Sequence, residues 1–379
     1  MEVHLEKIIK FALNVFHIVF LVIYLNKSFK NCHSPISYQI FLIFEHFRKI
    51  EFFPNFYISG NPKKFDKCKL CSFHPNNGSY PPNSSPRDAI FLLGLNKLTN
   101  LLPIVKTLRT SGSKCRLFLF TDNSTISKYK SQPKFMQSLE DCGTEFINLG
   151  KVVTGGLFNI CYLKYYIYKI FLKQNKFFFD RVIFMDLYDS IIQHDPFTTE
   201  FKQSLYLSNE GYIIKNDGFN TQYINSGYVQ LKNHCSDPEL IFSEEQKTNI
   251  SNGYILNGGL QQGGVDALIK LCEIMEKSGN IKERKSFLLD QSFLNMIVYS
   301  GYLKKRMEYT ILPAGNDLSS TIGIYVGKVK NVKFVFGNIS RDGHFPAILH
   351  QFDRSGQIKD DLKKVCPNDE NFTDYLRYR

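Results

Sequence analysis

Short apolar runs alternate with amphipathic segments between residues 88 and 185 of the chain. Four runs have the character of strands buried in a parallel sheet, and the segments Leu98–Leu108 and Ile160–Lys173 repeat apolar residues at helical spacing. This alternation predicts a doubly wound α/β sheet, whose ligands bind at the carboxyl ends of the strands near a switch in strand order. The predicted strands are Ala89–Leu93, Leu117–Thr121, Glu145–Leu149 and Val182–Met185.

The pattern loosens after Pro196, in the part of the chain that we expect to form the other side of a ligand cleft. An Asn-Gly-Gly sequence at residues 257–259 precedes an apolar helical face at residues 265–275, so we interpret the glycines as introducing a helix. Glycines let the backbone approach a ligand, and the N–H groups that start a helix bind anions. Asp290 is placed as the N-cap of a further apolar helix at residues 293–298.

An apolar run from Phe11 to Leu25 lies close to the N-terminus and follows two lysines. Extended back to Ile8, it approaches the ~20 residues that a membrane-spanning helix needs, and no small-residue cleavage site follows it. We therefore predict a cytoplasmic tail at residues 1–7 and a signal-anchor transmembrane helix at residues 8–25. A cleaved signal peptide and a buried helix of a cytosolic protein are the alternatives.

Residues 26–86 are irregular and rich in proline, which predicts a stem or linker before a globular domain at residues 87–379. The chain also contains Asn-x-Ser/Thr sequons without proline at the middle position. Together with the apolar run, these sequons favour a lumenal domain attached to the Golgi or endoplasmic reticulum membrane. The sequon asparagines are Asn26, Asn77, Asn83, Asn123, Asn249, Asn338 and Asn371.

Composition excludes some classes of protein. Hydrophobic residues make up 43% of the 379 residues, which is enough for a sizeable core. The formal net charge is +12, but the basic residues are dispersed, so we expect no nucleic-acid partner. Nine cysteines are an odd number, and only Cys68 and Cys71 form a close pair. This pair is compatible with disulfide bonding or with zinc, although a zinc ribbon requires a second such pair.

The strongest candidate chemistry follows the predicted strand Val182–Met185, where Asp186 and Asp189 stand three residues apart. Carboxylates at the end of a strand can hold Mg²⁺ or Mn²⁺, whose remaining positions take phosphate oxygens and water. A cation held there would stabilise a departing diphosphate. The alternative is an Asx-turn whose second aspartate is simply exposed.

The segment from Asp186 to Phe197 resembles the acidic-motif segment of GT-A fold glycosyltransferases. It is particularly similar to a group that reads Asp-x-Arg-Asp-Val-x-Phe-Gln-x-Asp-Pro-Phe. Three later segments follow in the same order as in that group. Asn257-Gly258-Gly259 resembles the group's Asn-Ala-Gly segment, and Asp290-Gln291 with Asn295 resembles its Asp-Gln…Asn segment. Residues 350–354 (His-Gln-Phe-Asp-Arg) resemble its His-Gln-Tyr-Asp-Arg segment. The resemblance spans residues 88–355 and implies a GT-A type, Rossmann-like mixed sheet flanked by helices.

The resemblance implies a metal site made of Asp186, Asp189 and His350. Lys164, followed by Tyr165, occupies the position of an Arg and an aromatic residue in such enzymes, and it is expected to contact the phosphates of the donor. Tyr188 replaces an expected Arg, and the Asp-x-x-Asp spacing differs from the stricter Asp-x-Asp of other relatives. These two departures leave the role of Asp189 open.

Other positions complete the expected site. Asp290 and Gln291 are the catalytic candidates, through contact with sugar hydroxyls or service as a general base, while the cap of a helix is the structural alternative for Asp290. Asn257, Gly258 and Gly259 are expected to contact the donor. Asn96 and Lys97 follow the first predicted strand, where the fold rule places the base and ribose of a nucleotide.

These observations predict a glycosyltransferase that moves a sugar from a nucleotide-sugar donor to a glycan or glycoprotein acceptor, with Mn²⁺ or Mg²⁺ as cofactor. A catalytically silent binding protein with the same fold is one alternative. A phosphohydrolase of the haloacid-dehalogenase type is another, although it would resemble its relatives in having the nucleophilic aspartate on the first strand, whereas here about three strands come first. The sequence does not identify the donor sugar, the acceptor or the stereochemical course.

Overall fold

A computed structural model describes residues 56, 58–75, 81–152, 157–198, 201, 203–233, 237–277, 290–323, 337–368 and 372. The predicted tail and signal-anchor, and the sequons at Asn26, Asn77 and Asn371, lie outside these residues. Within the described ranges, no helix combines the length and the apolar character that crossing a membrane requires.

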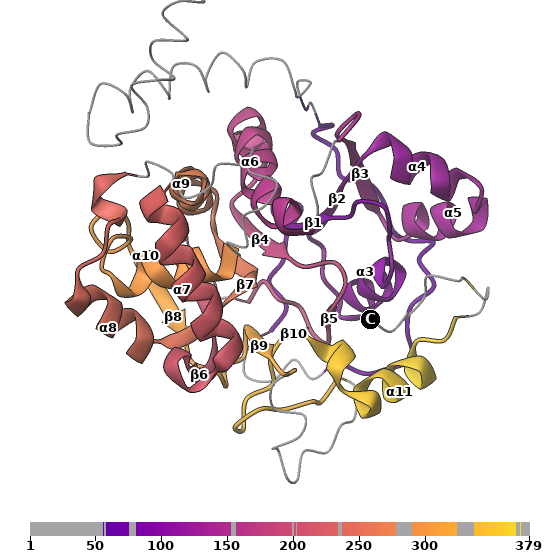
Figure 1. Cartoon of the computed structure of the whole chain (residues 1–379). Coiled ribbons are helices and arrows are strands. Elements are labelled where there is room, and N and C mark those ends of the chain that lie inside the picture. The colour runs from indigo at the N-terminus through magenta and orange to yellow at the C-terminus, as the bar shows by residue number, and fades with distance from the viewer. Residues whose placement is uncertain are drawn as a thin grey trace, which may run out of the picture.

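A seven-stranded sheet forms the centre of the structure, with its strands in the order β3-β2-β1-β4-β7-β6-β8 (Figure 1). Only β7 runs antiparallel to its two neighbours; every other pair in this sheet is parallel. The chain is therefore a mixed α/β protein with a mostly parallel sheet. The strands are β1 (Asp88–Leu93), β2 (Arg116–Thr121), β3 (Thr144–Asn148), β4 (Arg181–Met185), β6 (Leu205–Ile213), β7 (Tyr254–Gly264) and β8 (Tyr309–Leu312).

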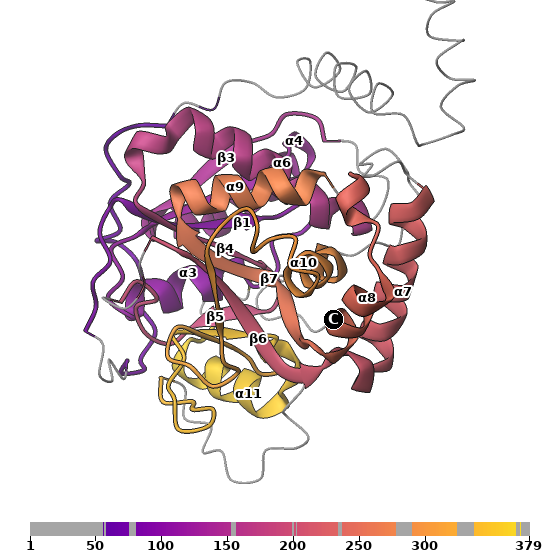
Figure 2. The same ribbon diagram turned by 90° about the vertical axis from the view of Figure 1, so that its left-hand side faces the viewer.

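Helices cover both faces of this sheet, with α6 and α9 on one side and α3 and α11 on the other (Figure 2). The alternating residues of β1 divide accordingly: Ala89 and Phe91 pack in the cluster with α6, and Ile90 and Leu92 in the cluster with α3. The helices are α3 (Leu101–Thr110), α4 (Asn123–Lys130), α5 (Pro133–Asp141), α6 (Leu157–Asn175), α7 (Gly218–Asn233), α8 (Glu244–Asn252), α9 (Val265–Glu276), α10 (Asp290–Tyr299) and α11 (Gly356–Val365).

A second, three-stranded sheet lies beside the carboxyl end of β4. It contains β5 (Ser190–Ile192), β9 (Ser319–Thr321) and β10 (Ile348–His350), in the order β5-β10-β9. The antiparallel pairing of β5 with β10 places His350 opposite Ser190. This small sheet therefore brings the late histidine next to the acidic turn, which is 160 residues earlier in the chain.

Strand order reverses between β1 and β4. From β1 the chain proceeds to β2 and β3 on one side of the sheet, and then returns to form β4 on the other side of β1. A reversal of this kind leaves a crevice at the carboxyl ends of the two central strands, and this is where ligands bind in open α/β sheets. Asp186 directly follows β4, and Asn96 and Lys97 follow β1, so both predicted ligand segments lie at this point.

The strands and helices predicted before residue 186 are confirmed to within three residues at each end. The interpretation of residues 257–259 as introducing a helix is wrong, because they lie inside the 11-residue strand β7. Helix α9 begins only after Gly264, which pairs with Arg181 at the amino end of β4. Its free N–H groups are thus roughly 17 Å, five strand residues, from Asp186 and do not serve the site.

Two disulfides join the segment at residues 58–75 to the main domain, Cys68–Cys142 and Cys71–Cys366. The disulfide interpretation of Cys68 and Cys71 is therefore confirmed, and the zinc alternative is wrong. Disulfides persist in oxidising compartments, so this pair indicates an extracytoplasmic location.

Candidate functional site

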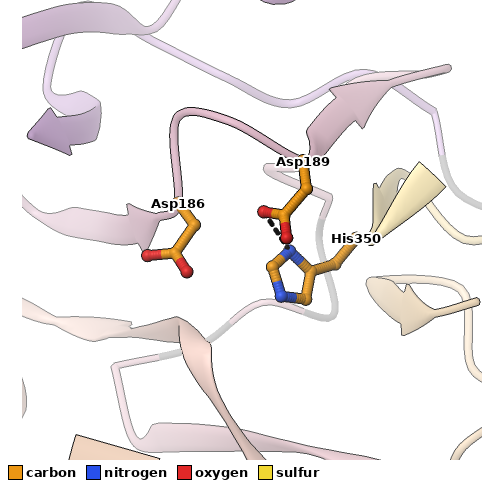
Figure 3. Close-up of side chains that lie close together, drawn as sticks. All are labelled: Asp186, Asp189 and His350. Carbon is orange, nitrogen blue, oxygen red and sulfur yellow. Dashed lines mark ion pairs between the residues drawn. The ribbon is translucent and has the colours of Figure 1, made fainter. Parts of the chain in front are cut away.

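Asp186, Asp189 and His350 form a cluster at the carboxyl end of β4, with one ligand atom from each residue within 4.8 Å of the others (Figure 3). The three come from different elements, since Asp186 follows β4, Asp189 precedes β5 and His350 ends β10. The side chain of Asp186 is 45% exposed, whereas those of Asp189 and His350 are 7% and 3% exposed. The cluster thus has two buried members and one that faces the solvent.

Hydrogen bonds fix the orientation of His350. Its Nδ1 lies 2.9 Å from Ser190 Oγ and 3.4 Å from Asp189 Oδ1, and the latter pair is drawn as a dashed line in Figure 3. The backbone N–H of Phe352 also donates to the carbonyl of Asp189 at 3.2 Å. The small sheet therefore holds the imidazole and the second carboxylate in register with each other.

Gly259 of β7 forms the opposite wall of the cluster. Its carbonyl accepts a hydrogen bond from the backbone N–H of Asp186 at 2.9 Å. A Cβ atom at this position would lie 2.5 Å from Asp186 Oδ2 and 2.8 Å from His350 Cε1. Glycine is required because the strand backbone packs directly against two of the three cluster residues.

The donor set fits a divalent cation. Two carboxylates provide the charge and the hard oxygen ligands that Mg²⁺ and Mn²⁺ prefer, and a nitrogen ligand favours Mn²⁺ of the two. Ligand atoms around one such ion are roughly 3–4 Å apart at bond lengths of ~2.1 Å. The ligand atoms of the cluster, which lie within 4.8 Å of one another, are close to this spacing. Three protein ligands leave positions for water or phosphate oxygens.

Lys164 of α6 lies between two carboxylates. Its Nζ is 2.6 Å from Asp290 Oδ2 and 3.8 Å from Asp186 Oδ1, and it also donates to the carbonyl of Gly258 at 2.6 Å. Burial lowers the pKa of Lys164, but the negative charges of Asp290 and Asp186 more than offset this, so its pKa is raised well above the usual value. The ammonium group therefore stays protonated beside the cluster.

Asp290 and Gln291 both reach the site from the first turn of α10. Asp290 is the first residue of this helix rather than the residue before it, and its Oδ1 accepts from the backbone N–H of Gln291. Gln291 Oε1 accepts from the N–H of Gly258 at 3.0 Å, and its Nε2 donates to Asn220 Oδ1 at 2.9 Å. These contacts join α10, β7 and α7 around one edge of the cluster.

Asn257 and its partner Glu210 lie at the same edge. Asn257 Oδ1 accepts from the N–H of Gly259 at 2.8 Å, and its Nδ2 donates to Glu210 Oε1 at 2.7 Å. The sequence did not point to Glu210 or Asn220, because neither follows an apolar run or belongs to a segment of the resemblance. Only the pairing of β6 with β7 brings Glu210 to Asn257.

Asn96 and Lys97 are exposed in the loop after β1, at the reversal of strand order. Tyr188 connects this loop to the acidic turn, because its hydroxyl lies 3.3 Å from the carbonyl oxygen of Leu95 and 3.2 Å from that of Lys97. Asn100 Nδ2 donates to the carbonyl of Tyr188. The tyrosine that replaces an expected Arg thus bridges the ends of β1 and β4.

Comparison of the sequence with protein-family models and with curated proteins found no match.

Proposed function

We propose that this protein is a metal-dependent glycosyltransferase that uses a nucleoside-diphosphate sugar as donor. The observation that carries the proposal is the convergence of segments that are far apart in the sequence. Asp186, Asp189 and His350 provide a set of cation ligands, Gly259 packs against them, and Asp290 is linked to Asp186 through Lys164. These are the segments that resemble GT-A transferases, and their meeting at one strand end supports a shared function.

The position of the cluster supports a nucleotide as part of the ligand. It lies at the strand-order reversal between β1 and β4, and the exposed Asn96 and Lys97 border the same crevice. A nucleoside in the crevice would place its diphosphate over the carboxyl end of β4. A divalent cation bound there neutralises phosphate charge and assists departure of the nucleoside diphosphate.

In this proposal the residues of the chain have separate tasks. Asp186, Asp189 and His350 hold the cation, and Lys164 keeps Asp290 in place while adding positive charge near the diphosphate. Asp290 and Gln291 border the region where an acceptor hydroxyl would approach. The acceptor would be a glycan or glycoprotein in the secretory lumen, which agrees with the disulfides and with the predicted signal-anchor.

The GT-A fold is the finer description that we propose for the mixed sheet. A haloacid-dehalogenase-like phosphohydrolase is less well supported, because the acidic turn follows the fourth strand along the chain and not the first. A catalytically silent binding protein would retain the fold and the polar contacts but would turn over no donor.

A screen of nucleotide-sugars tests the proposal. We expect purified protein to hydrolyse or transfer from at least one UDP- or GDP-sugar in the presence of Mn²⁺, and to stop when EDTA removes the metal. The variant Asp186→Ala should be inactive with the same donor. Binding without turnover of any donor would instead support the silent protein, and a phosphorylated Asp186 trapped with a phosphatase substrate would support the phosphohydrolase.

A further inference from the structure

Glu210 is a buried carboxyl group of β6. The residue is 2% exposed, yet no Lys or Arg side chain among the described residues forms an ion pair with it. Burial raises the pKa of Glu210, and the hydrogen bond from Asn257 and the charges of His350 and Arg354 oppose this effect only in part. A buried, incompletely compensated carboxyl costs stability, and such costs are retained mainly at functional positions.

The two oxygens of Glu210 have different surroundings. Oε1 accepts from Asn257 Nδ2 at 2.7 Å, and Asn257 in turn binds the N–H of Gly259, next to the cation ligands. Oε2 receives no hydrogen bond from any described residue. One oxygen is thus committed to Asn257, and the other has no hydrogen-bond donor in the part of the chain that the structure describes.

Strand order places Glu210 where the sugar of a donor would lie. Four neighbouring strands of the sheet follow in the order β1, β4, β7, β6. The nucleotide would lie at β1 and β4, and the cation ligands lie at the end of β4. Asn257 lies on β7 and Glu210 on β6. Neighbouring strands are about 4.8 Å apart, so β1 to β6 spans roughly 14 Å. A nucleotide-sugar is linear in the same order, with its diphosphate between the nucleoside and the sugar.

We propose that Glu210 binds a hydroxyl group of the transferred sugar through Oε2, while Oε1 holds Asn257 in place. The inference rests on the proposed function and adds a sugar-binding residue to the site. A carboxylate is an acceptor for hydroxyl donors, and its hydrogen bonds are stronger than those of a neutral amide. Glu210 therefore contributes to recognition of the sugar rather than to binding of the metal or the diphosphate.

The substitution Glu210→Gln separates these roles. Gln retains an oxygen for Asn257 but presents an NH₂ group, a donor, where the carboxylate has an acceptor. We expect the Kd for UDP or GDP with Mn²⁺, measured by calorimetry, to stay within about twofold of wild type. With the nucleotide-sugar that the donor screen identifies, kcat/KM should fall about 10- to 100-fold.

Glu276→Gln is the matched control. Glu276 is a partly buried carboxyl at the end of α9, paired with Lys169 outside the site, and its substitution should leave both readouts unchanged. If Glu210→Gln does not fold, Glu210→Asp is the alternative variant. It keeps the negative charge on a side chain that is shorter by one methylene group, and we expect the same loss of kcat/KM.

The outcomes are distinguishable. If wild type binds neither nucleoside diphosphate nor nucleotide-sugar with Mn²⁺, the proposed function fails and this inference fails with it. If wild type is active and Glu210→Gln retains its kcat/KM, only the role of Glu210 is overturned. An equal loss of diphosphate binding and kcat/KM in the variant would also overturn sugar contact, because it would show that Glu210 acts only through Asn257.

Discussion

The charged side chains at the two ends of the parallel strands are paired differently. At the amino end, carboxylates are matched by arginines in two-pronged pairs: Arg181 with Asp88, Arg116 with Glu145 and Arg87 with Asp180. At the carboxyl end, where Asp186, Asp189, Glu210 and Asp290 lie, the lysine Lys164 forms ion pairs with Asp186 and Asp290.

The difference supports the proposed ligand site at the carboxyl end. Paired, hydrogen-bonded charges at the amino end satisfy one another and hold the strands together. Uncompensated negative charge at the carboxyl end is unfavourable unless a cation joins it, so the proposed function separates stability and ligand binding along the same strands. Substitutions at the two ends should therefore affect different measurements.

The largest effect should come from removing charge from the cation ligands. Asp186→Asn and Asp189→Asn each keep the side-chain volume, and each should lower metal-dependent turnover by about 10³-fold, because removal of one stabilising group costs 10²–10³ or more. Asp180→Asn is the matched control, since its side chain is also 45% exposed but lies at the amino end. If turnover by Asp180→Asn falls as far as turnover by Asp186→Asn and Asp189→Asn, the proposed difference in function between the amino and carboxyl ends of the strands is refuted.

At Asp88 we expect a substitution to lower stability and to leave metal binding unchanged. Its side chain is buried and paired with Arg181, so Asp88→Ala leaves a partly buried guanidinium without its partner. Breaking such a pair costs about 3–5 kcal/mol. Chemical denaturation should show that loss, while the protein that remains folded binds Mn²⁺ with unchanged affinity. A change in metal affinity without a change in stability would contradict the structural role of the Asp88–Arg181 pair.

A smaller effect is expected for Gly259→Ala. The added methyl group would overlap Asp186 Oδ2, so the carboxylate or the strand must shift, at a cost of about 1–3 kcal/mol for overpacking. Mn²⁺ affinity should fall about tenfold. Gly218→Ala is the control, because a Cβ there has no atom within 4 Å. Equal metal affinities in the two variants would show that Gly259 does not set the position of Asp186.

The smallest effect should be a gain in stability for Glu210→Gln. Burial raises the pKa of Glu210 in the folded state above its value in the unfolded state. The contribution of this group to stability is therefore fully present below the unfolded-state pKa, and it is lost as the pH rises through the folded-state pKa. At neutral pH the neutral Gln avoids burying a charge, so the variant should melt at a higher temperature than wild type. The difference should disappear at acidic pH, and a difference independent of pH would contradict the stated cause.

The first half of the fold was predictable because strands β1, β2 and β4 are buried along nearly their whole length and therefore read as apolar runs. Strand β7 was not predictable in the same way, since Asn257 and four glycines interrupt it, and its close contact with Asp186 is what requires the glycine at 259. Local propensity favours a turn there, and only the tertiary packing against β4 makes it a strand.

The candidate site was predicted in part. Asp186, Asp189 and His350 were expected together, and the structure brings them together. Glu210 and Asn220 carry no local signal, because their role depends on hydrogen bonds to β7 and α10. The contact of Lys164 with Asp290 also depends on two helices more than 100 residues apart and could not be derived from sequence spacing.

Titration of the wild-type protein with Mn²⁺ tests the central claim most directly. Calorimetry or electron paramagnetic resonance should detect one ion per chain, competed by Mg²⁺ and enhanced by a nucleoside diphosphate. The site should be lost in Asp186→Asn and in His350→Ala, and retained in Asp180→Asn. Absence of a Mn²⁺ site in wild type, or binding that persists in both Asp186→Asn and His350→Ala, would contradict the account.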